Sequence, residues 1–490
     1  MIPTIIISLI TFTLITLLIL FFPTIKVGKI RLGTYWIIAL TGAVILLAFS
    51  FAPISEVFKE LTSNTTVNPL KIIILFFSMT ILSIYLDEVG LFKYLASVAA
   101  KKAKNNQYML FIILYFLTAT LTIFTSNDIV ILTFTPFICF FCKNSKINPI
   151  PYLIAEFAAA NTWSLMFIIG NPTNIYLATS AGITFFEYFK MMAIPTLCAG
   201  LIEFSLLFLL FNKKLRKPLE QSEEEVHIEN KPALIIGLSH LGTCLVFLII
   251  SSYIGIEMWI VSLICALSLL LSSVVMSLIT KKNWNYLSES LKKLPYQLIP
   301  FFLSMFVIVV ALNYQGISTK IAEVLGSANT IWTYGLSSFF VSNLINNIPM
   351  SILYSNICNN NAAIYASIIG SNIGAFLMPT GALAGIMFTN LVNEHETKFT
   401  FVDFVKYGAV ISIPLIATAS KVLFAASKKE NSKVEVVKGV VDGDIYDFDK
   451  LKALSVLPSY ETLLTQLAAG MLGTLSQLAI GLNMLTEKEA

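Results

Sequence analysis

Two clusters of polar residues interrupt apolar stretches of this chain, Ser126-Asn127-Asp128 and Asn346-Asn347. An Asn side chain offers both an acceptor and a donor, so these clusters could hydrogen-bond a small hydroxylated solute or coordinate Na+ without a buried positive charge. Asp128 is the one carboxylate among them. An ionisable group inside an apolar segment favours a role as coupling-ion ligand or proton carrier. The alternative is that Asp128 only caps the half-helix that follows.

A Pro/Gly break follows each cluster, at Gly170-Asn171-Pro172-Thr173-Asn174 and at Pro379-Thr380-Gly381. Broken helices expose carbonyl groups, which favour cations, and half-helix N-termini, which favour anions. The pair Asn161-Thr162 lies ahead of the first break, and Asn372 lies ahead of the second. Irregular polar backbone in corresponding parts of two apolar halves points to a solute site. The predicted substrate- or ion-binding residues are Ser126, Asn127, Asp128, Asn161, Thr162, Gly170, Asn171, Pro172, Thr173, Asn174, Asn346, Asn347, Asn372, Pro379, Thr380 and Gly381.

The composition is that of a polytopic membrane protein, with 57% hydrophobic residues, 12% charged residues and a mean hydropathy of +0.81. The net charge of +4 is spread over loops, so no nucleic-acid-binding surface is expected. The six cysteines are spread over apolar segments, which favours packing roles and predicts no metal site. Because HExxH and GxSxG patterns are absent from the sequence, we expect no enzyme, no catalytic residues and no cofactor. The coupling ion is expected to be H+ or Na+.

The clusters and breaks divide four long apolar runs. The runs 107–142 and 331–358 predict re-entrant hairpins with the polar clusters at their tips, and 152–180 and 362–389 predict broken helices. We therefore expect an all-α polytopic membrane protein of about 10–12 membrane segments in two inverted repeats, each with a re-entrant hairpin and a broken helix. Uninterrupted spans are predicted near 3–22, 34–52, 71–86, 191–211, 233–253, 258–280, 296–312 and 405–426.

The two repeats divide the chain into an N-terminal membrane half, 1–211, and a C-terminal membrane half, 232–427. Lys and Arg residues gather in the linker 212–231, which is cytoplasmic if the N-terminus lies outside. Residues 433–490 are less apolar and predict a soluble tail. We expect a multi-pass protein of the plasma or inner membrane, with the lipid bilayer and a small inorganic solute or anion as partners.

Several stretches resemble a known family: Tyr296 to Phe302, Ser342 to Pro349, Ile368 to Gly374 and Pro379-Thr380-Gly381. Together with Asn127-Asp128 they are similar to the arsenite/antimonite efflux permeases. That family belongs to the ion transporter superfamily, with D-type Na+/H+ antiporters and divalent-anion/Na+ symporters. The resemblance covers roughly residues 30–425. It implies a secondary carrier, and it allows a homodimer and the ATPase subunit of an arsenite pump as partners.

The expected function is efflux of arsenite or antimonite by alternating access, because neutral trihydroxides suit Asn and Ser side chains. The permeases of that family carry Asp where this chain has Asn161 and Asn372, which weighs against a simple proton cycle. A Na+/H+ antiporter or a Na+-coupled carrier of dicarboxylate or sulfate is the alternative. A membrane tether for ribosomes is a third reading, because residues 433–490 resemble the C-terminal part of the large-subunit ribosomal stalk-base protein. We interpret that stretch as a fused fragment.

Overall fold

The computed structural model describes residues 2–22, 24–27, 30–63, 68–104, 106–216, 227–251, 253–280, 286–326, 330–395, 397, 399–431, 438–441 and 444–447. The chain divides into two compact units, Met1–Ser427 and Lys428–Ala490. In the predicted tail 433–490 the described elements are the antiparallel strands β3 (Lys438–Val441) and β4 (Asp444–Asp447). The rest of that tail, and with it the stretch that resembles a ribosomal protein, lies outside the described residues. The same holds for residues 217–226 of the predicted linker.

The first unit begins with two apolar helices that pack against each other, α1 (Ile2–Phe21) and α2 (Thr34–Ala48). The antiparallel strands β1 (Thr24–Val27) and β2 (Ile30–Gly33) join them, and α3 (Ile54–Thr62) follows. The contact between α1 and α2 is close at Gly42, where a Cβ would lie 2.4 Å from Thr11 Oγ1.

Two sets of helices then follow in the same order, each with a long helix, a shorter helix, a helical hairpin, a broken helix and a closing helix. The first set consists of α4 (Pro69–Glu88), α5 (Leu91–Ala103), α6 (Gln107–Phe124), α7 (Asn127–Asn144), α8 (Ile150–Trp163), η1 (Ile168–Gly170), α9 (Pro172–Ser180) and α10 (Phe185–Phe211). The second set consists of α14 (Leu298–Tyr314), α15 (Ile317–Leu325), α16 (Thr330–Ile345), α17 (Asn347–Ile357), α18 (Asn361–Gly374), η2 (Pro379–Gly381), α19 (Leu383–Glu394) and α20 (Phe401–Asn431). That the sets have opposite orientations in the membrane stays a prediction.

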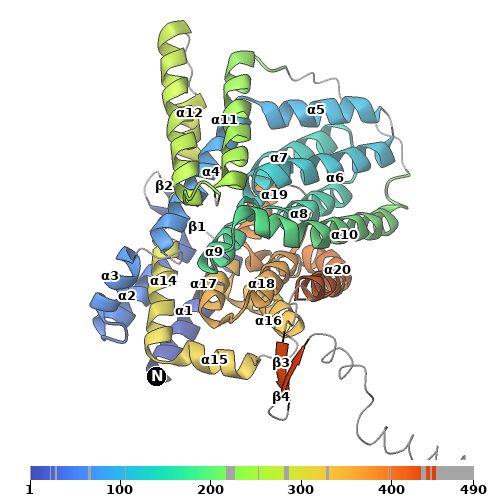
Figure 1. The fold of residues 1–490 in the computed structure, drawn as a ribbon. Helices are drawn as coiled ribbons and strands as arrows, with labels where there is room; N and C mark the ends of the chain where they lie inside the picture. The colour runs from blue at the N-terminus through green and yellow to red at the C-terminus, as the bar shows by residue number, and fades with distance from the viewer. Residues whose placement is uncertain are drawn as a thin grey trace, which may run out of the picture. The chain divides into compact units, whose positions relative to one another are not determined.

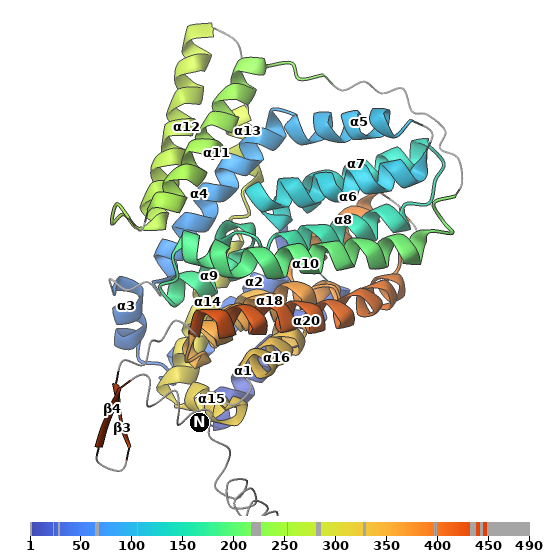
Figure 2. The same cartoon turned by 45° about the vertical axis from the view of Figure 1, so that its right-hand side comes forward.

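Three helices connect the sets: α11 (Lys231–Ile250), α12 (Met258–Thr280) and α13 (Tyr286–Lys293). Figure 1 shows α11 and α12 side by side next to α4, and α4, α11 and α12 contact one another. Figure 2 shows α6, α8 and α10 of the first set next to α16, α18 and α20 of the second, and α8 contacts α18. The two sets also meet where the hairpin of each packs against the broken helix of the other, α7 against α19 and α17 against α9.

Seven described helices are long and apolar enough to cross a membrane. They are Pro69–Glu88, Gln107–Phe124, Phe185–Phe211, Lys231–Ile250, Met258–Ile279, Tyr286–Tyr314 and Phe401–Ser427. Shorter apolar helices cover Ile2–Leu18 and Thr34–Ala48. The broken helices and the second hairpin consist of pieces shorter than these seven, because polar or Pro/Gly residues interrupt them. The predicted all-α polytopic membrane fold is confirmed.

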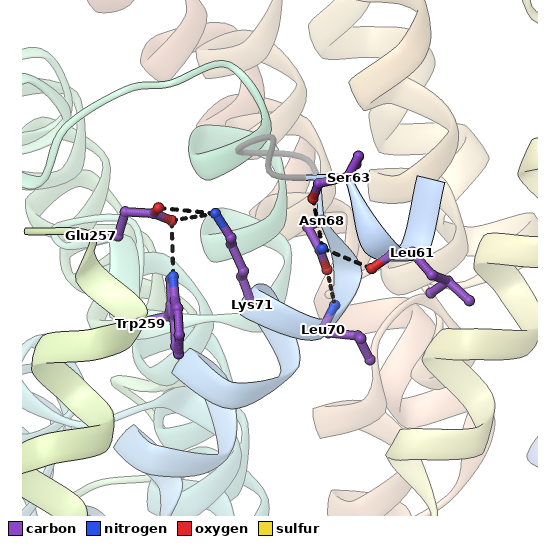
Figure 3. Close-up of polar contacts among 7 residues, drawn as sticks. All are labelled: Leu61, Ser63, Asn68, Leu70, Lys71, Glu257 and Trp259. Atoms are coloured by element: carbon purple, nitrogen blue, oxygen red, sulfur yellow. Dashed lines mark hydrogen bonds and ion pairs between the residues drawn. The ribbon is translucent and has the colours of Figure 1, made fainter. Parts of the chain in front are cut away.

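The start of α4 is fixed by its own N-cap residue and by an ion pair with a distant part of the chain (Figure 3). Asn68 Oδ1 accepts from Leu70 N at 2.8 Å, the usual N-cap contact. One turn later Lys71 Nζ lies 2.9 and 2.7 Å from the carboxylate oxygens of Glu257, which also accept a hydrogen bond from Trp259 Nε1 at 2.9 Å. This ion pair joins α4 to the connection between α11 and α12.

Candidate functional site

The tip of the first hairpin is attached to α8 by an asparagine pair. After α6 ends at Phe124, Ser126 is extended, with φ −144° and ψ 155°, and α7 begins at Asn127. Asn127 Oδ1 accepts from Asp128 N at 2.9 Å, and Asn127 Nδ2 donates to Asn161 Oδ1 at 3.0 Å. The structure therefore brings the first polar cluster into contact with the polar pair on α8.

Asp128 occupies the first turn of α7 without capping it. The N-cap residue is Ser126, and no side-chain cap bond is present there. The Asp128 side chain is 8% exposed, and its carboxylate makes no hydrogen bond or ion pair among the described residues. The capping alternative is therefore wrong, because the carboxylate does not bind the helix N–H groups it would have to satisfy. A nearly buried carboxylate without a partner remains available for a solute or an ion.

The first break, Gly170 to Asn174, is stabilised by hydrogen bonds from its own side chains. Asn171 Oδ1 accepts from Thr173 N at 3.0 Å and so caps α9, which has Pro172 at its first position. A Cβ on Gly170 would lie 2.2 Å from Ser164 O, so only glycine fits where the chain turns back on the end of α8. The break is a compact turn, and every residue from Ile168 to Ala178 is buried.

Asn372, on α18 of the second set, joins the two broken helices. Its Oδ1 accepts from Asn171 Nδ2 at 2.8 Å and lies 3.1 Å from Ser164 Oγ. Its Nδ2 donates to Asn174 Oδ1 at 2.8 Å and to Ile368 O at 2.8 Å. The Ile368 carbonyl can only accept, which fixes the orientation of this amide. Both donors of the fully buried Asn372 side chain are used, and its oxygen accepts from Asn171, while the single proton of the Ser164 hydroxyl goes to Asn161 O at 2.7 Å.

The tip of the second hairpin carries backbone strain. Asn346 separates α16 from α17 and has φ +71° and ψ 154°, a backbone conformation that is otherwise nearly confined to glycine. Its Nδ2 donates to Thr380 O at 2.9 Å, so this tip is attached to η2 of the second break. The first tip is likewise attached to the broken helix of its own set.

Two residues of this region were missed by the sequence reasoning. Asn343, on the last turn of α16, donates from Nδ2 to Phe339 O at 2.8 Å and to Gly374 O at 2.9 Å. A Cβ on Gly381 would lie 2.7 Å from Asn343 Oδ1, so η2 and α16 approach closely there. Ser164, which contacts Asn372, is the second. Both lie three residues from a predicted site residue, Asn343 before Asn346 and Ser164 after Asn161, so closeness in sequence to the predicted residues was the signal that could have found them.

Some of the buried side-chain oxygens without a hydrogen-bond partner lie at these tips and breaks, and others lie elsewhere among the described residues. Such an oxygen costs about 1–3 kcal/mol when left unsatisfied, so a group of them suits a ligand that donates hydrogen bonds, or a cation. The segments 125–131, 161–174, 343–349 and 371–385 contain no Lys or Arg. The oxygens are Ser126 Oγ, Thr173 Oγ1, Asn343 Oδ1, Asn347 Oδ1 and Thr380 Oγ1. Thr162 Oγ1 makes no hydrogen bond either, but it lies next to the Glu203 carboxyl of α10.

The family follows from comparison with known proteins. The family model described as "CitMHS: Citrate transporter" matches residues 17–366. The chain belongs to this family. It is 25% identical over 375 residues to the putative arsenical pump membrane protein of Bacillus subtilis (strain 168), covering 68% of this chain and 82% of that protein. It is 24% identical over 407 residues to an arsenical pump membrane protein of Escherichia coli, covering 79% of this chain and 92% of that one.

The fold is shared with a solved member of the transporter class. The crystal structure of the Alcanivorax borkumensis YdaH transporter matches 87% of this chain and 98% of its own, with a TM-score of 0.52 and 13% identity. This protein of the citrate transporter family is therefore a multi-pass membrane transporter and not an enzyme. The resemblance to the arsenite/antimonite permeases drawn from the sequence is confirmed at the level of the family.

Proposed function

We propose that this transporter exports arsenite or antimonite as neutral trihydroxides by alternating access. The observation that carries the proposal is the set of buried, unpartnered oxygens at the hairpin tips and breaks. A trihydroxide donates three hydrogen bonds and carries no charge, so it matches acceptor oxygens in segments that hold no Lys or Arg. Relatives named as arsenical pump membrane proteins over most of their length support this choice.

The solute site that we propose lies where each hairpin tip meets a broken helix. At the second tip Asn347 Oδ1 and Thr380 Oγ1 are buried and unpartnered, and the Asn346–Thr380 bond holds their two segments together. Asp128 supplies the ionisable group at the first tip. The broken helices of both sets are joined at Asn372, so a movement at one tip is transmitted to the other half of the chain.

A Na+-coupled carrier of a small anion such as a dicarboxylate is the second candidate function. The same neutral oxygens suit Na+, and helix N-termini at α7, α9 and α17 suit carboxylates. The description of the matching family as citrate transporters supports this candidate. It lacks the cationic side chain that usually accompanies a multiply charged anion, since none occurs in the four site segments.

Flux into inside-out vesicles separates the two candidates. Vesicles with the parent protein should accumulate arsenite, antimonite should compete, and citrate should neither compete nor accumulate with a Na+ gradient. Asn347→Ala should lower the uptake at least tenfold. Asn359→Ala, an exposed asparagine between α17 and α18, is the matched control and should behave like the parent. Na+-dependent citrate uptake without competition by antimonite would contradict the proposal in favour of the second candidate.

A further inference from the structure

A completely buried carboxyl group lies on α10, behind the residues of the candidate site. Glu203 is 0% exposed. Its carboxyl interacts with Tyr115 of α6 and Thr162 of α8, which are both uncharged. Other ionisable groups on helices packed against α10 face elsewhere: Glu156 of α8 contacts Thr135 of α7, and His240 of α11 contacts Ser268 of α12. No cation among the described residues therefore balances an ionised Glu203.

The distances around Tyr115 favour a protonated Glu203. Tyr115 Oη lies 2.6 Å from Gly200 O, 3.2 Å from Trp163 Nε1 and 3.1 Å from Glu203 Oε2. The Gly200 carbonyl can only accept and the Trp163 indole can only donate, while the tyrosine hydroxyl has a single proton. At 2.6 Å that proton belongs to the bond with Gly200. The contact with Glu203 is then a hydrogen bond only if the carboxyl is protonated and donates to Tyr115.

Two adjacent residues of α8, Asn161 and Thr162, link the Glu203 carboxyl to the candidate site. Thr162 follows Asn161, whose side chain accepts the hydrogen bond from Asn127 at the first hairpin tip. Tyr115 lies on α6, the helix that leads to the same tip. The surroundings are tightly packed, because a Cβ on Gly200 would lie 2.5 Å from ring atoms of Trp163. A shift of the hairpin against α10 therefore changes the contact between Tyr115 and Glu203.

We propose that Glu203 carries the coupling proton of this transporter, with Tyr115 as its positioning residue. In the conformation described, Glu203 is neutral and donates to Tyr115. When the hairpin moves and water reaches the carboxyl, the O–H bond of Glu203 breaks and the proton passes to water. The Tyr115 hydroxyl then turns from Gly200 O to the carboxylate and donates to it, which stabilises the charge. This proposal rests on the proposed function, because a coupling proton has a role only if the protein transports a solute against its gradient.

The protonation state is tested by infrared spectroscopy, independently of transport. The purified parent protein should show C=O stretching absorption of buried protonated carboxyls at neutral pH, and Glu203→Gln should lose one component of it while any component from Glu156 or Asp128 remains. Glu187→Gln, on the exposed first turn of the same helix, is the matched control and should keep every component. A spectrum of Glu203→Gln that is identical to the parent's would overturn the proposal.

The coupling role is tested by imposing a pH gradient on inside-out vesicles, with whichever of antimonite or citrate the parent accumulates. If the parent does not transport arsenite or antimonite, the coupling role of Glu203 can still be tested with citrate. Glu203→Gln should lower gradient-driven uptake at least tenfold, because its amide still donates to Tyr115 but cannot release a proton. Tyr115→Phe should move the pH of half-maximal uptake upward, a change that a purely structural role would not produce. Parent-like driven uptake by Glu203→Gln would refute the coupling role, and so would a parent that does not respond to the gradient.

Discussion

Replacing Asn372 by Asp tests whether its amide holds the two broken helices together. The side chain keeps its shape but loses both donors, so its oxygen faces Asn174 Oδ1 and Ile368 O, which can only accept. Each buried hydrogen bond lost in this way costs about 1–3 kcal/mol, which gives a loss of about 2–6 kcal/mol for Asn372→Asp. Protonation of the new carboxyl would restore one donor, so the deficit should shrink at acid pH.

The assay is unfolding in detergent, followed by thermal or steric-trapping methods, together with flux in vesicles. Asn356→Asp is the matched control, because Asn356 donates to Ile352 O at 3.0 Å with the same helical spacing but is exposed. We expect the control to lie within about 0.5 kcal/mol of the parent. Equal stability of Asn372→Asp and Asn356→Asp would refute the reasoning that the Asn372 amide is a required contact between the halves.

Three further predictions concern separate parts of the chain. Asp128→Asn should lower flux at least tenfold and leave the unfolding midpoint unchanged, because the carboxylate has no partner to lose; parent-like flux would place Asp128 outside the site. Burial alone would raise the pKa of Glu257, but its hydrogen bonds with Lys71 and Trp259 lower it, so the ion pair stabilises the fold above pH 4.5 and is lost as the pH falls further. Because Glu257 is partly exposed, Glu257→Gln should remove less than about 1 kcal/mol near neutral pH and reduce the acid sensitivity of unfolding, and an unchanged acid profile would contradict this. Truncation after Ser427, where the first compact unit ends, should leave membrane insertion and flux intact, and loss of flux at normal abundance would show that the tail is needed.

The positions of the hairpin tips and breaks could be predicted because they are energetically unusual. Polar residues within an apolar run are costly in lipid unless the backbone there is irregular and protected. The run 107–142 is divided at Ser126, between α6 and α7, and the run 331–358 is divided at Asn346, between α16 and α17. Pro172 likewise begins α9 after the first interruption, and Pro379 begins the short η2 turn that forms the second one.

The partners of these residues could not be predicted, since they depend on contacts between distant parts of the chain. Asn372 was expected to bind solute, but its side chain is bonded to Asn171, Asn174 and Ile368. The environment of Glu203 could not be predicted either, because the sequence does not show that Tyr115 faces it. Sequence patterns locate polar groups, and the tertiary structure determines which of them remain unpaired.

Anomalous scattering from antimonite tests the central claim most directly, because antimony is heavy enough to be located in crystals of the full chain. We predict one strong antimony peak at the second hairpin tip, where the hydroxyl groups on the metalloid reach Asn347 Oδ1 and Thr380 Oγ1. The peak should disappear in crystals of Asn347→Ala. A peak at cysteine sulfurs, or none at saturating antimonite, would contradict the claim that the hairpin tips and breaks form the solute site.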